Sequence, residues 1–151
     1  MKNNTPRKKY HLFLICTKMN QPSVILFDGV CNLCNASVQF VIKHDKAARF
    51  TFASLQSESG QKLLQQYYLK QTDFNSFVLI ENDQAYTKST AALMVAKRLN
   101  GLYKLFYGFI IVPPFIRDAV YNLIAKNRYK WFGKKDSCMI PTPALQSKFL
   151  K

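Results

Sequence analysis

Two cysteines three positions apart carry the clearest chemistry in this sequence. Cys31 and Cys34 form a Cys-x-x-Cys motif, and residues at this spacing on the first turn of a helix lie close enough to form a disulfide. A thiolate at a helix N-terminus is stabilised by the helix dipole and by unpaired N–H groups. Such a thiolate attacks a substrate disulfide, and the second cysteine resolves the mixed disulfide without a cofactor. We expect Cys31, nearer the helix start and more exposed, to be the nucleophile, and Cys34, partly covered, to be the resolving cysteine.

Asp28, three positions before Cys31, admits two interpretations. It can accept the proton of Cys34 during resolution, which requires that burial raises the pKa of the carboxyl group. It can instead accept hydrogen bonds from backbone N–H groups of the turn, as aspartate commonly does. The two roles are compatible, so both stay open at this point.

A Cys-x-x-Cys motif is also half of a zinc site. A structural zinc site has four ligands, and the other cysteines and histidines of the chain form no second close pair: His11, Cys16, His44 and Cys138. We therefore predict no metal and no other cofactor. A Cys-based zinc site and a pair of cysteines that merely pack in the core remain alternatives. We expect Cys16 to be incidental, and Cys138 has no assigned role.

The predicted redox motif stands between a strand and a helix. Val24-Ile25-Leu26-Phe27 is a short apolar, β-branched run that ends at Asp28-Gly29, as in a strand buried on both faces. From Cys34 onward, apolar residues recur at helical spacing as far as Ile42. A tight turn that carries Asp28, Cys31 and Cys34 therefore joins the two elements.

The next elements complete an α/β pattern. They are predicted as a strand, a helix, a hairpin and a helix at residues 50–52, 57–70, 77–87 and 89–99. Asn82-Asp83 forms the hairpin turn, Ser89 or Thr90 caps the last helix, and Asn100-Gly101 ends it. The order βαβαββα predicts a mixed four-stranded sheet with flanking helices.

The C-terminal third predicts a helical extension. Residues 105–116 form an apolar run broken by Pro113-Pro114. Because a membrane span needs about 20 residues, we interpret this run as buried structure or as an interfacial segment. A helix follows as far as Gly133, with one apolar face formed by Ile116, Val120, Leu123 and Ile124.

Two separated motifs resemble the DCC family of predicted thiol-disulfide oxidoreductases. The first is DGVCNLC at residues 28–34, and the second runs from RDAVY at 117–121 through AKNRYKWFG at 125–133 to Cys138 and Pro141. The resemblance covers about residues 23–141. It implies a thioredoxin-like fold and a site formed by Asp28, Cys31 and Cys34. It attaches no activity to the second motif, so Arg117, Asp118 and Arg128 stay unassigned.

The resemblance does not extend to every feature of better-understood thioredoxin-like enzymes. Those proteins usually carry a cis-proline before the first strand of the hairpin, facing the Cys-x-x-Cys. The corresponding residues 74–77 are FNSF, without proline. Neither a redox potential nor the use of glutathione therefore follows from the resemblance.

Length, composition and charge exclude several classes of protein. A chain of 151 residues that is 48% hydrophobic and 14% aromatic is not a disordered polycation. Its four cysteines are too few for a disulfide-stapled secreted scaffold. We predict one domain at residues 23–141, a disordered N-terminal extension at 1–22 and a C-terminal tail at 142–151. Met19 is a second plausible start of translation.

The net charge of +14 belongs to the two ends of the chain. Residues 1–20 carry +5, residues 21–100 only +2, and residues 101–151 carry +7. The predicted redox site therefore lies in a nearly neutral segment. The charge indicates a preference for acidic partners near the C-terminal helix.

Together these features predict a cytoplasmic thiol-disulfide oxidoreductase. Its expected partners are disulfide-containing proteins or small thiols, and the absence of a signal-peptide pattern favours the cytoplasm. The alternative is a binding module whose basic, aromatic C-terminal helix contacts nucleic acid or an anionic membrane, through Tyr121, Arg128, Tyr129, Lys130, Trp131, Lys134 and Lys135. Of these two partners we do not expect nucleic acid, and a peripheral membrane contact stays open.

Overall fold

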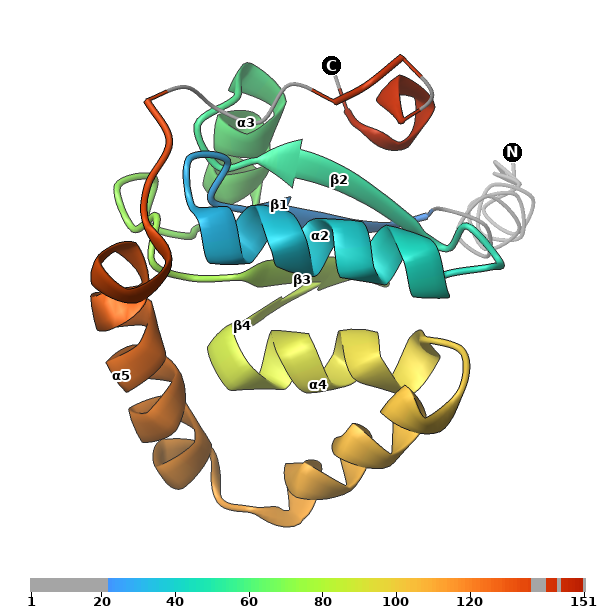
Figure 1. Cartoon of the computed structure of the whole chain (residues 1–151), viewed down its shortest axis with the longest axis vertical. Coiled ribbons are helices and arrows are strands. Elements are labelled where there is room, and N and C mark those ends of the chain that lie inside the picture. The colour runs from blue at the N-terminus through green and yellow to red at the C-terminus, as the bar shows by residue number, and fades with distance from the viewer. Residues whose placement is uncertain (1–21, 137–140, 144, 151) are drawn as a thin grey trace, which may run out of the picture.

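A mixed four-stranded sheet forms the centre of the computed structural model, which describes residues 22–136, 141–143 and 145–150 (Figure 1). Its strands are β1 (Ser23–Phe27), β2 (Phe50–Ser54), β3 (Val78–Glu81) and β4 (Gln84–Thr87). They lie in the order β2-β1-β3-β4, and β1 is parallel to β2 and antiparallel to β3. The predicted α/β sheet is confirmed. Most of the predicted N-terminal extension, together with Cys16, Met19 and Cys138, lies outside the described residues.

Helices cover both faces of this sheet. On one face, α2 (Asn32–His44) and α4 (Lys88–Arg98) pack over a core that includes Ile25 and Phe27 of β1. On the other, α3 (Glu58–Gln66) packs over a core that includes Leu26. Because neighbouring residues of a strand point to opposite faces, both sides of β1 are buried, as its continuous apolar sequence predicts.

The predicted hairpin is present, and a two-residue turn connects its strands. Asn82 and Asp83 have positive φ angles of 50° and 59°, which a two-residue type I′ turn requires and which these residue types tolerate. The turn sets the register in which Glu81 faces Gln84. This tight turn brings β3 and β4 together as the last two strands of the sheet.

The helix α2 begins at Asn32 with Cys31 as its N-cap residue, so Cys31 stands at the helix start and Cys34 within the first turn, as predicted. Two other predicted helix boundaries differ from the structure. The helix α3 ends at Gln66, before Tyr68, whose φ is positive. The predicted caps of α4 are wrong, because α4 begins at Lys88 and the Ser89 hydroxyl donates a hydrogen bond to the carboxylate of Asp118 instead.

The C-terminal extension is helical, but it does not pack as predicted. It consists of the 3-10 helix η1 (Leu102–Ile111) and the helix α5 (Pro114–Phe132). Of the two interpretations of residues 105–116, burial is wrong, because η1 contains no buried residue, and an interfacial segment stays a prediction. The apolar face predicted for α5 is exposed as well, while Ala125 and Arg128 are its buried residues. Hydrogen bonds hold the inward face of α5 instead, as described below.

The last described residues return to the sheet. After the short 3-10 helix η2 (Gln146–Lys148), the Leu150 N–H donates to the Phe52 carbonyl at 2.8 Å. The Phe149 ring lies 6.2 Å from that of Phe27 and 5.7 Å from that of Phe52, between ring centroids. Within the described parts of the chain, no helix is long and apolar enough to cross a membrane.

Candidate active site

The two cysteines of the motif meet at the start of α2. Cys31 is the N-cap residue, and its Sγ accepts a hydrogen bond from the Cys34 backbone N–H at 3.4 Å. Both cysteines are free thiols. An N-cap side chain faces the unpaired N–H groups and the positive end of the helix dipole. The structure therefore places the Cys31 sulfur at the N-terminal end of α2, where it accepts from a backbone N–H.

The exposure of the two cysteines is the reverse of the prediction. Cys31 is fully buried, at 0% relative exposure, and Cys34 is half-buried. Residues 133–135, which we call the covering segment, lie beside the turn, with Lys134 paired to Cys31 in an isolated β-bridge. In this pairing the Lys135 N–H donates to the Val30 carbonyl at 2.8 Å. A stretch about a hundred residues further along the chain thus pairs with the backbone at Cys31, which local sequence cannot reveal.

Cys34 lies in an environment that favours the neutral thiol. Burial raises the pKa of Cys34 well above its usual value, and the neighbouring Cys31 sulfur raises it further. The positive charge of Arg128 acts in the opposite direction and favours the Cys34 thiolate. The pair is therefore asymmetric, with an N-cap sulfur at Cys31 and a thiol that holds its proton at Cys34.

Asp28 is buried and fully engaged in hydrogen bonds. Its Oδ2 accepts from Arg128 Nη2 at 2.7 Å and from the Tyr129 hydroxyl. Its Oδ1 accepts from Gln56 Nε2 at 2.7 Å and from the Val30 N–H at 3.2 Å. Burial alone would raise the pKa of Asp28, but these four donors together hold it below the ordinary value of 3.8. The raised pKa that the proton-transfer interpretation requires is therefore not found, and the backbone hydrogen bond of the other interpretation is present.

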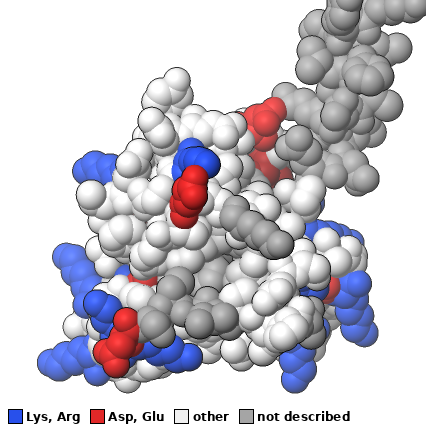
Figure 2. Space-filling model, turned by 90° about the horizontal axis from the view of Figure 1, so that it is seen from above, with Lys and Arg blue, Asp and Glu red and all other residues white. Residues whose placement is uncertain are grey.

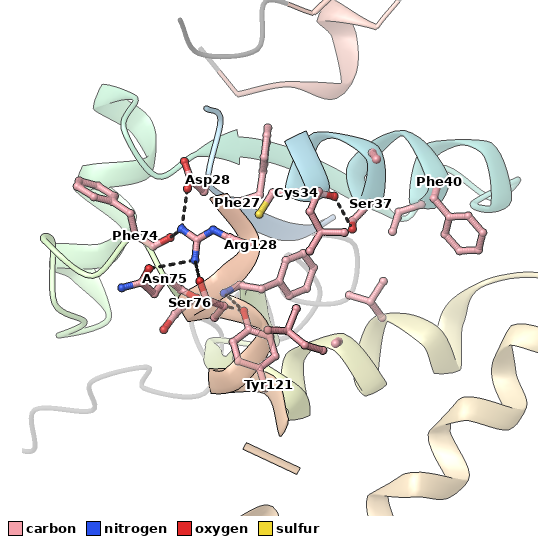
Figure 3. Close-up of a pocket in the computed structure, with 18 of the residues that line it drawn as sticks. Phe27, Asp28, Cys34, Ser37, Phe40, Phe74, Asn75, Ser76, Tyr121 and Arg128 are labelled. Carbon is pink, nitrogen blue, oxygen red and sulfur yellow. Dashed lines mark hydrogen bonds and ion pairs between the residues drawn. The ribbon is translucent and has the colours of Figure 1, made fainter. Parts of the chain in front are cut away.

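Arg128 connects the cysteine turn to the loop before β3. It is 3% exposed, and besides Asp28 it donates to the Phe74 carbonyl from Nη2 and to Asn75 Oδ1 from Nη1, both at 3.0 Å. In Figure 3 the guanidinium group lies between Asp28 and Asn75, with the Cys34 sulfur nearby. Residues 74–76 occupy the place where the resemblance leads one to look for a proline. Here a buried arginine holds that loop.

A second side chain of α5 supports the same loop. The Tyr121 hydroxyl accepts from the Phe77 N–H at 2.8 Å and donates to the Asn75 carbonyl at 3.4 Å. Tyr121, Ala125 and Arg128 are spaced four and three residues apart, so they share one face of α5. This periodicity was the available signal for a functional face, but it was obscured by the stronger apolar periodicity on the other side of the helix.

The remaining unassigned residues of the second motif do not reach the cysteines. Arg117 Nε donates to the Val112 carbonyl at 2.8 Å, within the extension itself. Asp118 accepts from Ser89 and thereby ties α5 to α4. Tyr129 does belong to the site, and burial together with its contact to Asp28 raises the pKa of Tyr129 to about 12. The phenol therefore stays protonated and donates to the carboxylate.

A cavity of about 620 Å³ opens beside Cys34, between α2, α4 and α5. Cys34, Asp28 and Arg128 stand at one end of it, and Phe40 stands at the far end (Figure 3). Most of the remaining wall is apolar, and it includes Val95 of α4 and Ile124 of α5. Cys31 is not part of this wall. The half-buried thiol of the pair is thus the one that faces the cavity.

The other predicted alternatives concern metal and charge. Among the described residues, no group of three or more His, Cys, Asp or Glu side chains is arranged to hold a metal ion. On the face seen in Figure 2, the described Lys and Arg side chains project mainly from the edges of the molecule. The described basic side chains are therefore not gathered over the centre of that face.

A dithiol at a strand-to-helix turn of a four-stranded mixed sheet defines a thioredoxin-like redox fold. Comparison with known proteins agrees, because residues 25–134 match the family model described as DCC1-like thiol-disulfide oxidoreductase. The chain belongs to this family.

The chain is also similar to two named proteins of other organisms. The chain is 57% identical over 127 residues to the uncharacterized protein YuxK of Bacillus subtilis strain 168, covering 84% of this chain and 93% of YuxK. It is 45% identical over 116 residues to the chloroplastic DCC family protein At1g52590 of Arabidopsis thaliana, covering 76% of this chain and 67% of that protein. No solved structure matches the chain.

Proposed function

We propose that this protein exchanges electrons between the Cys31–Cys34 dithiol and a disulfide of a protein or small molecule. The observation that carries the proposal is the hydrogen bond from the Cys34 N–H to the Cys31 Sγ at the N-cap of α2. It places the Cys31 sulfur at the positive end of the α2 dipole, while burial raises the pKa of Cys34. A reactive sulfur and a proton-holding partner are the two parts that disulfide exchange requires.

The proposed reaction has two thiol–disulfide exchanges. The Cys31 thiolate attacks one sulfur of the substrate disulfide, that S–S bond breaks, and the first substrate thiolate leaves. Cys34 then loses its proton and attacks the Cys31 sulfur of the mixed disulfide, which releases the second substrate thiolate. Two electrons pass from the protein to the substrate, which leaves as two thiols after protonation. The reverse sequence oxidises a dithiol substrate.

Asp28 and Arg128 have supporting roles in this proposal. Four donors lower the pKa of Asp28, so in this proposal its carboxylate serves as an acceptor for them rather than as the base for Cys34. It holds Arg128, whose positive charge favours the Cys34 thiolate that forms during resolution. Arg128 Nε is buried without a hydrogen-bond partner among the described residues, so one donor of the guanidinium group remains free near the cysteines. We therefore assign both residues as positioning residues.

The covering segment adds one requirement to the proposed mechanism. Because Cys31 is fully buried beside residues 133–135, a substrate disulfide reaches its sulfur only when this segment moves away from the turn. Opening needs the loss of few hydrogen bonds, among them the one from the Lys135 N–H to the Val30 carbonyl. Each such bond contributes about 1 kcal/mol.

The test uses single cysteine variants on a background in which Cys16 and Cys138 are replaced by serine. With an insulin-type protein disulfide as substrate, Cys31→Ser should abolish reduction. Cys34→Ser should abolish turnover but accumulate a mixed disulfide with the substrate, detectable by mass spectrometry. Equal rates in the parent and both variants would refute the proposal. An adduct that accumulates in Cys31→Ser instead would reverse the roles of the two cysteines.

A second candidate function, attachment to an anionic membrane, is supported by a different surface. Of the fifteen large hydrophobic side chains that are exposed among the described residues, twelve lie on η1 and α5. We call these twelve the apolar patch: Leu102, Leu105, Phe106, Phe109, Ile111, Phe115, Ile116, Val120, Leu123, Ile124, Trp131 and Phe132. An exposed patch of this extent marks a contact surface for a membrane or a protein.

Charge favours the membrane as the occupant of the apolar patch. Residues 88–135 carry ten basic residues and one acidic residue, Asp118. Exposed apolar side chains flanked by lysine and arginine are typical of helices that lie in the interface of an anionic bilayer. A second copy of the chain would bring like charges together. Nucleic acid is a poorer fit, because aliphatic side chains do not stack on bases.

Vesicle binding tests the second candidate. The protein should sediment with vesicles of phosphatidylglycerol and phosphatidylcholine but much less with pure phosphatidylcholine, and the emission of its one tryptophan, Trp131, should shift to shorter wavelength. Phe106→Ser together with Phe109→Ser should weaken binding at least about tenfold, because each removes an exposed aromatic ring that the bilayer would bury. Tyr68→Ser is the matched control, since Tyr68 is 98% exposed but lies outside the apolar patch. Equal binding by both variants, or concentration-dependent dimerisation without vesicle binding, would refute attachment through this patch.

A further inference from the structure

The cavity beside Cys34 offers no free charge to a ligand. Of the residues that line it, only Asp28 and Arg128 are charged, and they form an ion pair with each other at 2.7 Å. Both are almost completely buried. A charged ligand group placed in this cavity would lose its hydration without gaining a partner of opposite charge, which is costly. The cavity therefore disfavours ionised ligands.

The walls of the cavity favour an apolar group instead. They are formed by aromatic and aliphatic side chains of α2, α4, α5 and the loop before β3, such as Phe40, Val95, Ile124 and Phe74. A cavity of about 620 Å³ falls within the range of sites that hold small organic molecules, roughly 300–1,000 Å³. Burying apolar surface in such a site is favourable in proportion to its area. The size and walls together match an uncharged apolar group of several carbon atoms.

The position of Cys34 connects this cavity to the reaction. In the mixed disulfide, the substrate sulfur is bonded to Cys31, and Cys34 must reach the Cys31 sulfur to release it. Cys34 lines the cavity, and its backbone N–H contacts the Cys31 sulfur, so one residue links the cavity wall to the sulfur that carries the substrate. Nothing else in the cavity wall carries a thiol among the described residues.

From these observations we infer that the cavity binds an uncharged, apolar substituent of the substrate disulfide, and that it sets the specificity of the enzyme. This inference rests on the proposed exchange at Cys31 and Cys34. The substituent is either the alkyl group of a small disulfide or a large apolar side chain next to a cysteine in a peptide, since both present the same chemistry. Multiply charged disulfides such as oxidised glutathione are poor substrates on this basis.

The experiment compares three aliphatic disulfides that differ in the polarity of their tails. The reduced protein is oxidised with dipropyl disulfide, bis(2-hydroxyethyl) disulfide or 3,3′-dithiodipropionate, and each rate is divided by the rate with free dithiothreitol to correct for intrinsic reactivity. Dipropyl disulfide should react at least about tenfold faster, after this correction, than the dianionic compound. Equal corrected rates for the three compounds would overturn the inference while leaving the proposed function intact. Failure of the parent to react with any of the three faster than the Cys31→Ser variant would instead refute the proposed function.

Variants in the cavity wall test the location. Ala92 lines the cavity and is exposed on α4, so Ala92→Phe should fill it and lower the rate with dipropyl disulfide several-fold while changing that with bis(2-hydroxyethyl) disulfide by less than about twofold. Ala119→Phe is the matched control, because Ala119 is exposed on α5 outside the wall. Equal effects of the two variants would show that the preference for dipropyl disulfide does not arise in this cavity.

A charge introduced into the wall should reverse the preference. Ile124 lines the cavity, whereas Val120, one turn earlier on α5, does not. Ile124→Lys should raise the rate with 3,3′-dithiodipropionate and lower that with dipropyl disulfide, and Val120→Lys should change the ratio of the two rates much less. An unchanged ratio in Ile124→Lys would overturn the inference.

A peptide series identifies the source of the apolar group. Two disulfide-linked peptides that differ only by leucine or serine beside the cysteine are compared in the same assay. A preference for leucine that disappears in Ala92→Phe assigns the cavity to protein substrates, and a preference confined to the small disulfides assigns it to small molecules. Absence of a preference in both series overturns the inference.

Discussion

The core from β1 to α4 and the extension formed by η1 and α5 use apolar residues in opposite ways. In the core, the apolar side chains of the strands and helices are buried against one another, as with Leu79 at 0% exposure. In the extension, apolar side chains face outward, and the inward face of α5 is held by an arginine and tyrosines. The core is stabilised mainly by burial of apolar surface. The extension contributes polar groups around Cys34, and its apolar face is exposed among the described residues.

The largest expected effect tests whether the Asp28–Arg128 ion pair attaches the extension to the core. Arg128→Leu leaves the Asp28 carboxylate buried without its cation, so the free energy of unfolding should fall by about 3–5 kcal/mol. Arg117→Leu, which removes a contact made only within the extension, should cost about 1 kcal/mol or less. Denaturant unfolding measures both. Similar losses in the two variants would mean that the Asp28–Arg128 pair does not anchor α5.

The next effect compares equivalent truncations in the two regions. Leu79→Ala creates a cavity in the core and should lower the free energy of unfolding by about 2–5 kcal/mol. Leu123→Ala removes a side chain of the apolar patch that is 58% exposed. This variant should change the free energy of unfolding by about 0.5 kcal/mol at most. Both are read from urea unfolding of the monomer. A large loss in Leu123→Ala would show that the patch is covered within the protein in solution.

A smaller effect depends on pH. Because the folded pKa of Asp28 lies below 3.8, the unfolded chain takes up this proton first as the pH falls. The stabilisation from Asp28 is therefore complete above about pH 5 and is lost, at up to about 1.4 kcal/mol per pH unit, from 3.8 down through the folded pKa. Asp28→Asn should be less stable than the parent at pH 7 and should approach it in acid. A stability difference that does not vary with pH would contradict the lowered pKa.

The smallest effect concerns the covering segment, the part of the extension nearest Cys31. Lys135→Pro removes the N–H that bonds the Val30 carbonyl, and the loss of about 1 kcal/mol should speed alkylation of Cys31 by iodoacetamide about fivefold. Lys135→Ala keeps the N–H and serves as the matched control. Peptide mass mapping measures the labelling of Cys31. Equal labelling in the two variants would show that this hydrogen bond does not limit access.

What the sequence determines by itself is mainly local. A continuous apolar run forms β1. Cys31 and Cys34 come together because one turn of helix separates them. Asn82-Asp83 specifies the hairpin turn because these residues tolerate positive φ. These features depend on neighbours within a few residues. The order of the elements then restricts the sheet to few topologies, and the observed one is among those expected.

Only the tertiary structure decides which groups surround the two cysteines. Arg128 and Asp28 are a hundred residues apart, and helical periodicity favoured burying the opposite, apolar face of α5. The inward face could be polar because Asp28, Asn75 and the Phe74 carbonyl supply acceptors for the buried guanidinium group. The same long-range packing buries Cys31 beside residues 133–135 and raises the pKa of Cys34. Burial and charge at a site are sums over distant chain segments, so they follow from the fold rather than from the motif.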